Sequence, residues 1–256
     1  MINRLEGKTA LVTGATSGIG EAAARQLAEL NVNLIITGRR EERLKILADD
    51  IIKEYSVDVT IGAFDIRDRK ACLNFVEDLG DTKIDILINN AGLSRGLDPV
   101  YSADFQDWDE MIDTNVKGLL TMTRLITPKM KERNEGHVIN IGSIAGHEAY
   151  PGGSVYCATK HAVTAITQST KFDLHGTNIR VSMVSPGLVE TEFSNVRFHG
   201  DDKKADKVYK GMTPLTGNDI AEIIVFIANR PVHVDIMDTV VFPVYQSSST
   251  FVHRDE

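Results

Sequence analysis

The chain has 256 residues, of which 42% are hydrophobic and 25% are charged, a composition that suits one sizeable globular domain with a single core. A net charge of −8 without a dense basic run argues against nucleic-acid binding, and no apolar stretch approaches the roughly 20 residues of a membrane helix. Because signal-peptide, disulfide and metal-ligand patterns are also missing, we expect one cytoplasmic domain, residues 1–256, without metal, nucleic acid or membrane contact.

Short apolar runs alternate with segments of helical periodicity almost from end to end. The runs Leu34–Ile36 and Ile86–Ile88 are apolar throughout, which is typical of parallel strands covered on both faces. This alternation predicts an α/β fold with a doubly wound, seven-stranded parallel sheet. The strand candidates are Thr9–Thr13, Asn33–Thr37, Val57–Phe64, Ile84–Asn89, His137–Gly142, Arg180–Ser185 and Thr239–Val244.

A glycine-rich loop follows the first strand candidate and opens a helix. Its spacing, G-x-x-x-G-x-G, is one residue longer at the front than the usual dinucleotide fingerprint. Glycines there let backbone N–H groups approach a pyrophosphate, although such a loop by itself is often only a turn. Its position between a strand and a helix favours the nucleotide reading. The expected contacts are Gly14, Thr16, Ser17, Gly18, Ile19 and Gly20.

The end of the second strand candidate indicates which dinucleotide is bound. NAD-preferring sites usually carry an acid there, and this chain has Gly38 followed by Arg39 and Arg40. A guanidinium matches a 2′-phosphate in charge and geometry, so we expect NADP(H). The alternative is that the two arginines only solvate the start of a helix.

Two further turns are candidates for the adenosine end. Asp65 and Ile66 follow the third strand candidate, and the carboxylate is a potential acceptor for the adenine amino group. Asn90, Ala91 and Gly92 follow the fourth, where an amide and small residues suit a site beside the adenosine. Both segments also fit ordinary turn chemistry.

Tyr156 and Lys160 are four residues apart in a segment with the residue mix of a helix, so they share one face. An adjacent ammonium group lowers the pKa of a phenol below its usual value of about 10. With the hydroxyl of Ser143, the pair suits proton transfer to or from a substrate oxygen while a hydride moves at its carbon. A Tyr-x-x-x-Lys pair alone is a weak signal.

The combined motifs resemble those of the short-chain dehydrogenase/reductase family over nearly the whole chain. The resemblance implies a single Rossmann-fold domain in which Tyr156 donates or accepts the proton, Lys160 binds the nicotinamide ribose and Ser143 holds the substrate oxygen. It also implies that Asn115, in a kinked helix, fixes a water of a proton relay. The motifs that carry it are Thr13–Gly20, Asn89–Gly92, Asn115, Ser143, Tyr156, Lys160 and Pro186-Gly187. The contacts it implies for the nicotinamide carboxamide are Pro186, Gly187, Val189 and Thr191.

A narrower resemblance, in Thr191–Phe198, Gly200–Lys203 and Phe242–Gln246, is to NADP-dependent 3-hydroxy acid dehydrogenases. It implies small anionic substrates such as serine, allo-threonine or 3-hydroxypropionate. The alternatives are a sulfoacetaldehyde reductase that forms isethionate, a reductase of larger neutral carbonyls, and a nucleotide sensor without turnover. The last is disfavoured because the catalytic serine, tyrosine and lysine are all present. The stretch His147–Ala149 departs from the branch and leaves the substrate open.

We expect Arg197 to anchor the anion, with Tyr150 and Gln246 as hydrogen-bonding partners; the alternative is a solvent-facing arginine and two packing residues. Arg197 lies in a charged segment, 188–216, interpreted either as a substrate lid or as a solvated surface helix. The resemblance implies a homotetramer built from helices 106–131 and 156–173. The tail, 245–256, is expected to cross to a neighbouring subunit and help close a pocket.

Overall fold

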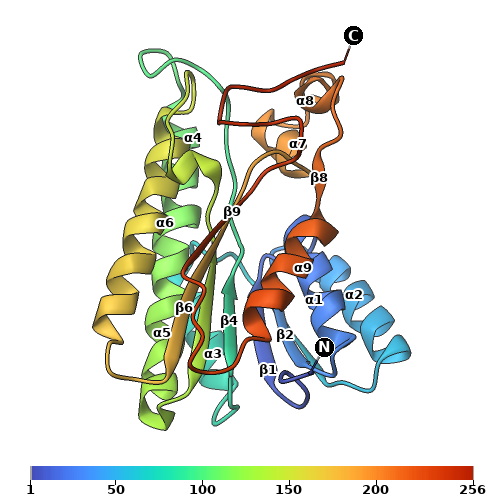
Figure 1. Ribbon diagram of the computed structural model, residues 1–256, viewed down its shortest axis with the longest axis vertical. Coiled ribbons are helices and arrows are strands. Elements are labelled where there is room, and N and C mark those ends of the chain that lie inside the picture. The colour runs from blue at the N-terminus through green and yellow to red at the C-terminus, as the bar shows by residue number, and fades with distance from the viewer. Residues whose placement is uncertain (1, 256) are drawn as a thin grey trace.

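Seven parallel strands form the main sheet of the computed structural model, which describes residues 2–255 (Figure 1). Their spatial order is β3-β2-β1-β4-β5-β6-β9, which confirms the doubly wound arrangement. The largest boundary error lies in β9, which ends at Val241 and not at Val244. The strands are β1 (Thr9–Thr13), β2 (Asn33–Gly38), β3 (Val59–Ala63), β4 (Ile86–Asn89), β5 (Gly136–Ile141), β6 (Ile179–Pro186) and β9 (Asp238–Val241).

Helices cover both faces of this sheet. α1, α2 and α9 pack on one face, and α3, α5 and α6 pack on the other (Figure 1). No helix within residues 2–255 combines the length and the apolar character that crossing a bilayer requires. The bounds of these helices are α1 (Gly18–Ala28), α2 (Glu41–Glu54), α3 (Arg69–Asp78), α5 (Leu119–Arg133), α6 (Ser154–Asp173) and α9 (Gly217–Ala228).

The core explains why the central strands are apolar throughout. Leu34 and Ile36 of β2 join the cluster under α1, α2 and α9, whereas Ile35 joins the cluster on the opposite face. Successive side chains of a strand point to opposite faces, so both sets must be apolar when helices cover both. This burial fixes the strand register, and with it the position of each loop at the carboxyl ends.

The helix expected between residues 106 and 131 is a continuous rod with a distortion in its middle. It consists of α4 (Phe105–Ile112), a π-helical turn η1 (Asp113–Gly118) and α5. A π turn bonds i to i+5 and so breaks the regular ladder of the helix. Asn115 lies in this turn, which confirms the predicted kink.

Residues 188–216, the lid, form a separate layer above the carboxyl ends of the strands. Its base is a parallel pair of β7 (Val189–Glu190) and β8 (Leu215–Thr216), and its top holds α7 (Phe193–Arg197) and α8 (Asp202–Tyr209). The strand order reverses between β1 and β4, and open α/β sheets bind ligands at such a point. The lid and the described part of the tail, residues 245–255, lie on this side of the sheet (Figure 1).

Candidate active site

A cavity of about 680 Å³ opens where β1, β4, β5 and β6 end, beneath the lid. It brings together every sequence-predicted site residue except Gly20 and Asn115. The nucleotide side of its wall holds Gly14, Thr16, Ser17, Gly18, Ile19, Arg39, Arg40, Asp65, Ile66, Asn90, Ala91 and Gly92. The opposite side holds Ser143, Tyr150, Tyr156, Lys160, Pro186, Gly187, Val189, Thr191, Arg197 and Gln246.

The glycine loop is shaped by close backbone approaches. Gly14 has φ of +68°, and a Cβ on it would lie 2.8 Å from the Ala91 Cα. A Cβ on Gly20 would lie 2.4 Å from the Asn90 Nδ2, so this glycine serves packing beneath the loop and does not face the cavity. The Asn90 amide donates to the Thr13 and Gly14 carbonyls at 2.9 and 3.1 Å. Asn90 therefore stabilises the loop, as the turn interpretation of this residue expected.

The amino end of α1 fits a pyrophosphate. The helix begins at Gly18, and the side chain of Ser17 makes no capping hydrogen bond to its first turn. First-turn N–H groups without a side-chain acceptor carry the positive end of the helix dipole. Because Ser17, Gly18 and Ile19 all line the cavity, an anion there would meet these donors directly.

Arg40 is held against the glycine loop by several hydrogen bonds. Its Nη2 donates to the Thr16 Oγ1 and the Ser17 Oγ, both at 2.8 Å. Its Nη1 forms an ion pair with Glu192, at 2.7 Å. Arg39 lines the same part of the wall with an exposed side chain. The two arginines thus place positive charge where the second strand ends, as an NADP site requires.

Asp65 forms an ion pair with a neighbour that sequence reasoning did not single out. Both carboxylate oxygens of Asp65 accept from Arg67, at 2.7 to 3.1 Å. Burial raises the pKa of Asp65, but the hydrogen bonds and charge of Arg67 outweigh it and lower the pKa below its usual value. The carboxylate is therefore ionised at neutral pH, and Arg67 holds it in place at the wall of the cavity.

Ser143, Tyr156 and Lys160 converge on the cavity from two elements, and all three are buried. Tyr156 and Lys160 are on α6, and Ser143 precedes the short 3₁₀ turn η2 (Ile144–Gly146), where its Oγ accepts from the Ala145 N–H at 3.1 Å. The Lys160 Nζ donates to the Ile141 carbonyl at 2.9 Å and lies 5.9 Å from the centre of the Tyr156 ring.

The expectation that Lys160 acidifies Tyr156 is wrong for this structure. Burial raises the pKa of Tyr156, and the opposing influences come from the charge of Arg197 and a hydrogen bond with Ser143. Burial also lowers the pKa of Lys160 to about 8. Sequence spacing could place the ammonium near the phenol but could not show that desolvation dominates both groups. At neutral pH Tyr156 therefore carries its proton.

Asn115 lies outside the cavity wall and stabilises the site through hydrogen bonds. Its Nδ2 donates to the Leu93 carbonyl at 2.8 Å and to the Thr159 Oγ1 at 3.1 Å, and its Oδ1 accepts from the Leu93 N–H at 2.8 Å. The side chain thus joins the loop after β4 to α6. A relay water at this residue would have to bind the backbone of the π turn, because the amide is already engaged.

Arg197 faces Tyr156. Its Nη2 donates to the Tyr150 hydroxyl at 3.2 Å, and its guanidinium carbon lies 5.3 Å from the ring centres of both Tyr156 and Phe193. Its Nε is buried and has no hydrogen-bond partner among residues 2–255. Arg197 is half-buried and lines the cavity, between Tyr150 and Tyr156.

Gln246 lines the cavity but its amide is occupied by backbone groups. Its Oε1 accepts from the Leu188 N–H at 2.8 Å, and its Nε2 donates to the Ser248 carbonyl at 3.0 Å. A Cβ on Gly187 would lie 2.2 Å from the Gln246 Oε1, so a side chain there would displace this amide. Gln246 therefore fastens the tail to the start of the lid, a role that the sequence did not indicate.

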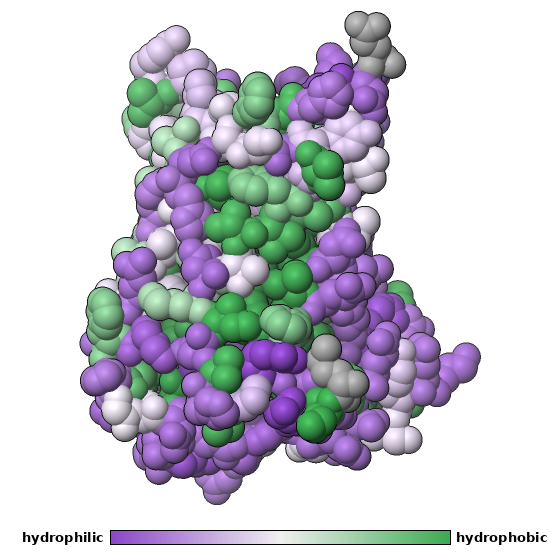
Figure 2. All heavy atoms as spheres, in the orientation of Figure 1, coloured by the Kyte–Doolittle hydropathy of each residue, from purple (hydrophilic) through white to green (hydrophobic). Residues whose placement is uncertain are grey.

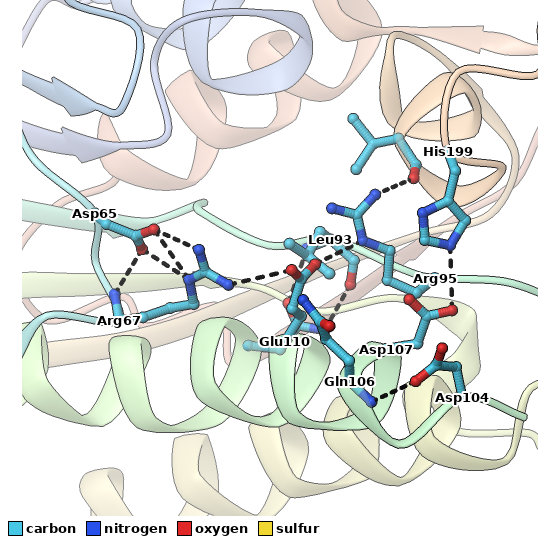
Figure 3. Close-up of polar contacts among 11 residues, drawn as sticks. Asp65, Arg67, Leu93, Arg95, Asp104, Gln106, Asp107, Glu110 and His199 are labelled. Atoms are coloured by element: carbon cyan, nitrogen blue, oxygen red, sulfur yellow. Dashed lines mark hydrogen bonds and ion pairs between the residues drawn. The ribbon is translucent and has the colours of Figure 1, made fainter.

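A polar network missed by sequence reasoning fixes the lid to the body of the protein (Figure 3). Arg95 donates through Nε to Glu110 at 2.8 Å and through Nη1 to the Val196 carbonyl at 2.6 Å. The Gly96 N–H donates to the Arg197 carbonyl at 2.8 Å. Cations and donors suit the unsatisfied carbonyls at a helix end, so this network caps α7 and orients Arg197.

The network continues toward the nucleotide side of the cavity. Glu110 also forms an ion pair with Arg67, at 3.5 Å, and Arg67 holds Asp65 (Figure 3). At the other end, His199 of the lid lies 3.2 Å from Asp107. These contacts join segments far apart in the chain, and no local motif marks them.

The tail closes the cavity of its own chain. The Ser249 N–H donates to Glu148 at 2.8 Å, and Ser249 and Arg254 both line the wall. Arg254 donates to the Val208 carbonyl of the lid at 2.9 Å. Glu148, in the stretch that departs from the 3-hydroxy acid branch, is one of the tail's anchors.

Comparisons with known proteins agree with this geometry. The profile of the short chain dehydrogenase family matches residues 8–202. The chain is 45% identical to an NADP-dependent 3-hydroxy acid dehydrogenase of Schizosaccharomyces pombe, over the whole of both chains. It is 48% identical to the NADP-dependent 3-hydroxy acid dehydrogenase YdfG of Salmonella typhi, over 95% of this chain and 98% of the other.

Solved structures extend the likeness to three dimensions. The closed form of a serine dehydrogenase complexed with NADP⁺ is 46% identical, with a TM-score of 0.88, over 96% of this chain and 99% of that one. The serine dehydrogenase of Escherichia coli is 41% identical, with a TM-score of 0.81, over 93% and 99%. The predicted family is confirmed: the chain belongs to the short-chain dehydrogenase family of oxidoreductases.

Proposed function

We propose that this protein is an NADP-dependent oxidoreductase that interconverts a small anionic 3-hydroxy acid and its aldehyde or ketone. The observation that carries the proposal is the position of Arg197, which lines the cavity with its guanidinium carbon 5.3 Å from the centre of the Tyr156 ring. A carboxylate bound there would place the neighbouring carbons of a small acid beside the phenol. Charge-assisted hydrogen bonds of this kind are the strong ones.

The cofactor side of the cavity supports NADP. Arg39 and Arg40 supply positive charge at the end of β2, Gly14 and the first turn of α1 leave room and donors for a pyrophosphate, and relatives of this chain are named as NADP-dependent. Bound NADP would supply the hydride acceptor for oxidation, or the hydride donor for reduction. Lys160 and the segment from Pro186 to Thr191 are proposed to hold its nicotinamide end.

Side chains of the protein would donate or accept the proton that the substrate oxygen gains or loses. In reduction, Tyr156 gives its phenolic proton to the substrate oxygen, and Ser143 donates a hydrogen bond to the same oxygen. Tyr156 enters this step protonated, because burial raises its pKa. In oxidation the phenolate accepts the proton of the hydroxyl. The Lys160 ammonium and the backbone of the π turn around Asn115 are proposed to pass protons to solvent.

Serine, allo-threonine and 3-hydroxypropionate are the substrates we favour. Each places a carboxylate two carbons from the reacting hydroxyl carbon, which suits a guanidinium that lies against the catalytic ring. A sulfonate such as isethionate meets the same requirement, and therefore remains the second candidate. Larger neutral carbonyls are less suited, because they would leave the Arg197 charge buried against Phe193 and Tyr156 without an anion.

A substrate panel tests the proposal. The formation of NADPH or NADH is followed by absorbance with serine, allo-threonine, 3-hydroxypropionate, isethionate and 1-propanol, each with NADP⁺ and with NAD⁺. We expect the highest kcat/KM for a carboxylate with NADP⁺, and poor activity with NAD⁺ or with the neutral alcohol. Equal rates for 1-propanol and the acids would refute the anion site, and a preference for NAD⁺ would refute the cofactor.

We also propose a cytoplasmic homotetramer. Figure 2 shows apolar side chains gathered across the face on which β9 forms the sheet edge. Exposed apolar residues of this region include Met237, Val240 and Val244. Leu120 of α5 and Phe172 of α6 are also exposed, on the two helices expected to pair between subunits. Sedimentation analysis would test the assembly.

A further inference from the structure

One acidic side chain of the lid lies among the arginines of the nucleotide site. Glu192, which precedes α7, pairs with the Arg40 Nη1 at 2.7 Å and with the Arg43 Nη1 at 2.6 Å. Arg40 and Arg43 belong to the start of α2, on the nucleotide side of the cavity, whereas Glu192 belongs to the segment that carries Arg197. This carboxylate therefore joins the two halves of the site directly.

Each nitrogen of the Arg40 guanidinium makes a hydrogen bond in this arrangement. Its Nη2 and Nε bond to the hydroxyls of Thr16 and Ser17, and its remaining group, Nη1, bonds to Glu192. A guanidinium has only five N–H donors in a fixed plane. An incoming phosphate must share or take the donors that face Glu192, and its charge would repel that carboxylate at close range.

We propose that Glu192 takes the place of the cofactor's 2′-phosphate: it neutralises Arg40 and Arg43 and fastens the lid to α2, and a bound 2′-phosphate displaces it. The proposal rests on the NADP specificity proposed above. Displacement frees the first turn of α7, which holds Phe193 against Tyr156. Cofactor binding is thereby linked to the position of Arg197 at the far end of the same helix, five residues along the chain.

Two consequences distinguish this role from an ordinary surface ion pair. Removing the Glu192 charge must strengthen the binding of a 2′-phosphate, although it removes two ion pairs from the folded protein. The linkage is also reciprocal, so the mobility of the lid must respond to the 2′-phosphate itself and not to the adenosine. Both can be measured without turnover.

The binding test uses two nucleotides that differ only in the 2′-phosphate, adenosine 2′,5′-bisphosphate and adenosine 5′-monophosphate. Dissociation constants are measured by calorimetry for the unaltered protein, Glu192→Gln and the control Glu190→Gln. Glu190 is an exposed acid of β7 whose side chain makes no hydrogen bond or ion pair with another residue among 2–255. We expect Glu192→Gln to bind the bisphosphate about three- to tenfold more tightly, which matches the strength of exposed ion pairs. The monophosphate should bind equally to all three proteins.

The three partners are 41 to 46% exposed, so the gain should shrink as salt is added. Equal or weaker bisphosphate binding by Glu192→Gln would overturn the proposal, as would an equal gain in Glu190→Gln. If the unaltered protein does not prefer the bisphosphate over the monophosphate, the NADP proposal fails and this inference fails with it. If it does prefer the bisphosphate but Glu192→Gln gains nothing, only this inference fails.

A second measurement uses the unaltered protein and so does not depend on the folding of a variant. Amide hydrogen exchange of residues 192–200 is followed with each nucleotide. We expect the bisphosphate to speed exchange in this segment, and the monophosphate to leave it unchanged. Exchange that is unchanged or slowed by the bisphosphate would show that Glu192 does not act as a tether.

Discussion

The guanidinium of Arg197 lies 5.3 Å from the ring centre of Tyr156. Burial raises the pKa of the phenol, and the nearby positive charge of Arg197 is the largest influence that opposes it. A bound carboxylate would neutralise part of that charge. The Arg197 charge by itself favours loss of the phenolic proton, and a bound carboxylate would weaken that effect, so substrate binding helps to keep the proton on Tyr156.

Replacing Arg197 with methionine should separate the two substrate classes. We expect KM for a 3-hydroxy acid to rise about 10- to 100-fold, the value of a lost hydrogen bond to a charged group, with cofactor binding unchanged. The control is Lys207→Met, because Lys207 is an exposed cation of α8 outside the cavity wall. Steady-state kinetics with an acid and with 1-propanol would check this, and an equal loss for both substrates would contradict it.

Arg95 should act through Arg197. In Arg95→Lys a single ammonium cannot bridge Glu110 and the Val196 carbonyl as the guanidinium does, so α7 loses part of its cap. We expect KM for the acid to rise about three- to tenfold, consistent with one lost hydrogen bond, and kcat to change less. The double variant Arg95→Lys, Arg197→Met should be no worse than Arg197→Met alone.

Arg124→Met is a suitable control for Arg95, because Arg124 is an exposed arginine of α5 away from the cavity. Fully additive losses in the double variant would mean that Arg95 acts independently of the anion anchor.

The direction of the reaction should depend strongly on pH. Only the deprotonated phenol can accept a proton, and burial moves the pKa of Tyr156 upward, so oxidation should speed up as pH rises. Reduction uses the protonated phenol and should be fastest at neutral pH or below. Lys160 loses its charge as pH rises through about 8, which should flatten the alkaline gain in oxidation. If the initial rate of oxidation were highest at or below pH 7, the predicted rise of this rate with pH would be wrong.

The tail should control access to the cavity. Arg254→Met removes the donors to the Val208 and Lys210 carbonyls of the lid. We expect faster amide exchange in residues 247–255 and a higher KM for the acid, because the wall that the tail forms becomes mobile. Light scattering should show the same oligomer as the unaltered protein. A changed oligomer would mean that the tail serves assembly instead.

Local sequence patterns were sufficient to predict the fold and most of the side chains that line the candidate site. Leu34–Ile36 is apolar because helices cover both faces, and Gly14 is glycine because the loop needs a positive φ; both constraints are visible in neighbouring residues. Contacts such as Glu192 with Arg40 or Arg95 with Val196 were not predictable in this way. They depend on how the lid folds over the sheet, and motifs of a few neighbouring residues do not indicate this.

The pKa of Tyr156 was mispredicted for a related reason. Spacing on α6 shows that Lys160 is near, but burial is a property of the whole fold, and here its effect exceeds that of neighbouring charges. Gln246 shows the same limit, since its amide was expected at the substrate and bonds instead to the backbone of Leu188 and Ser248.

The role of Tyr156 as the group that exchanges a proton with the substrate is tested most directly by Tyr156→Phe. The single-turnover rate of hydride transfer should be measured with saturating substrate and NADPH, together with the dissociation constant of NADPH. We predict a loss of at least about 100-fold in the rate, the usual contribution of a positioned acid, with NADPH affinity nearly unchanged. A phenylalanine variant that turns over as fast as the unaltered enzyme would contradict the account.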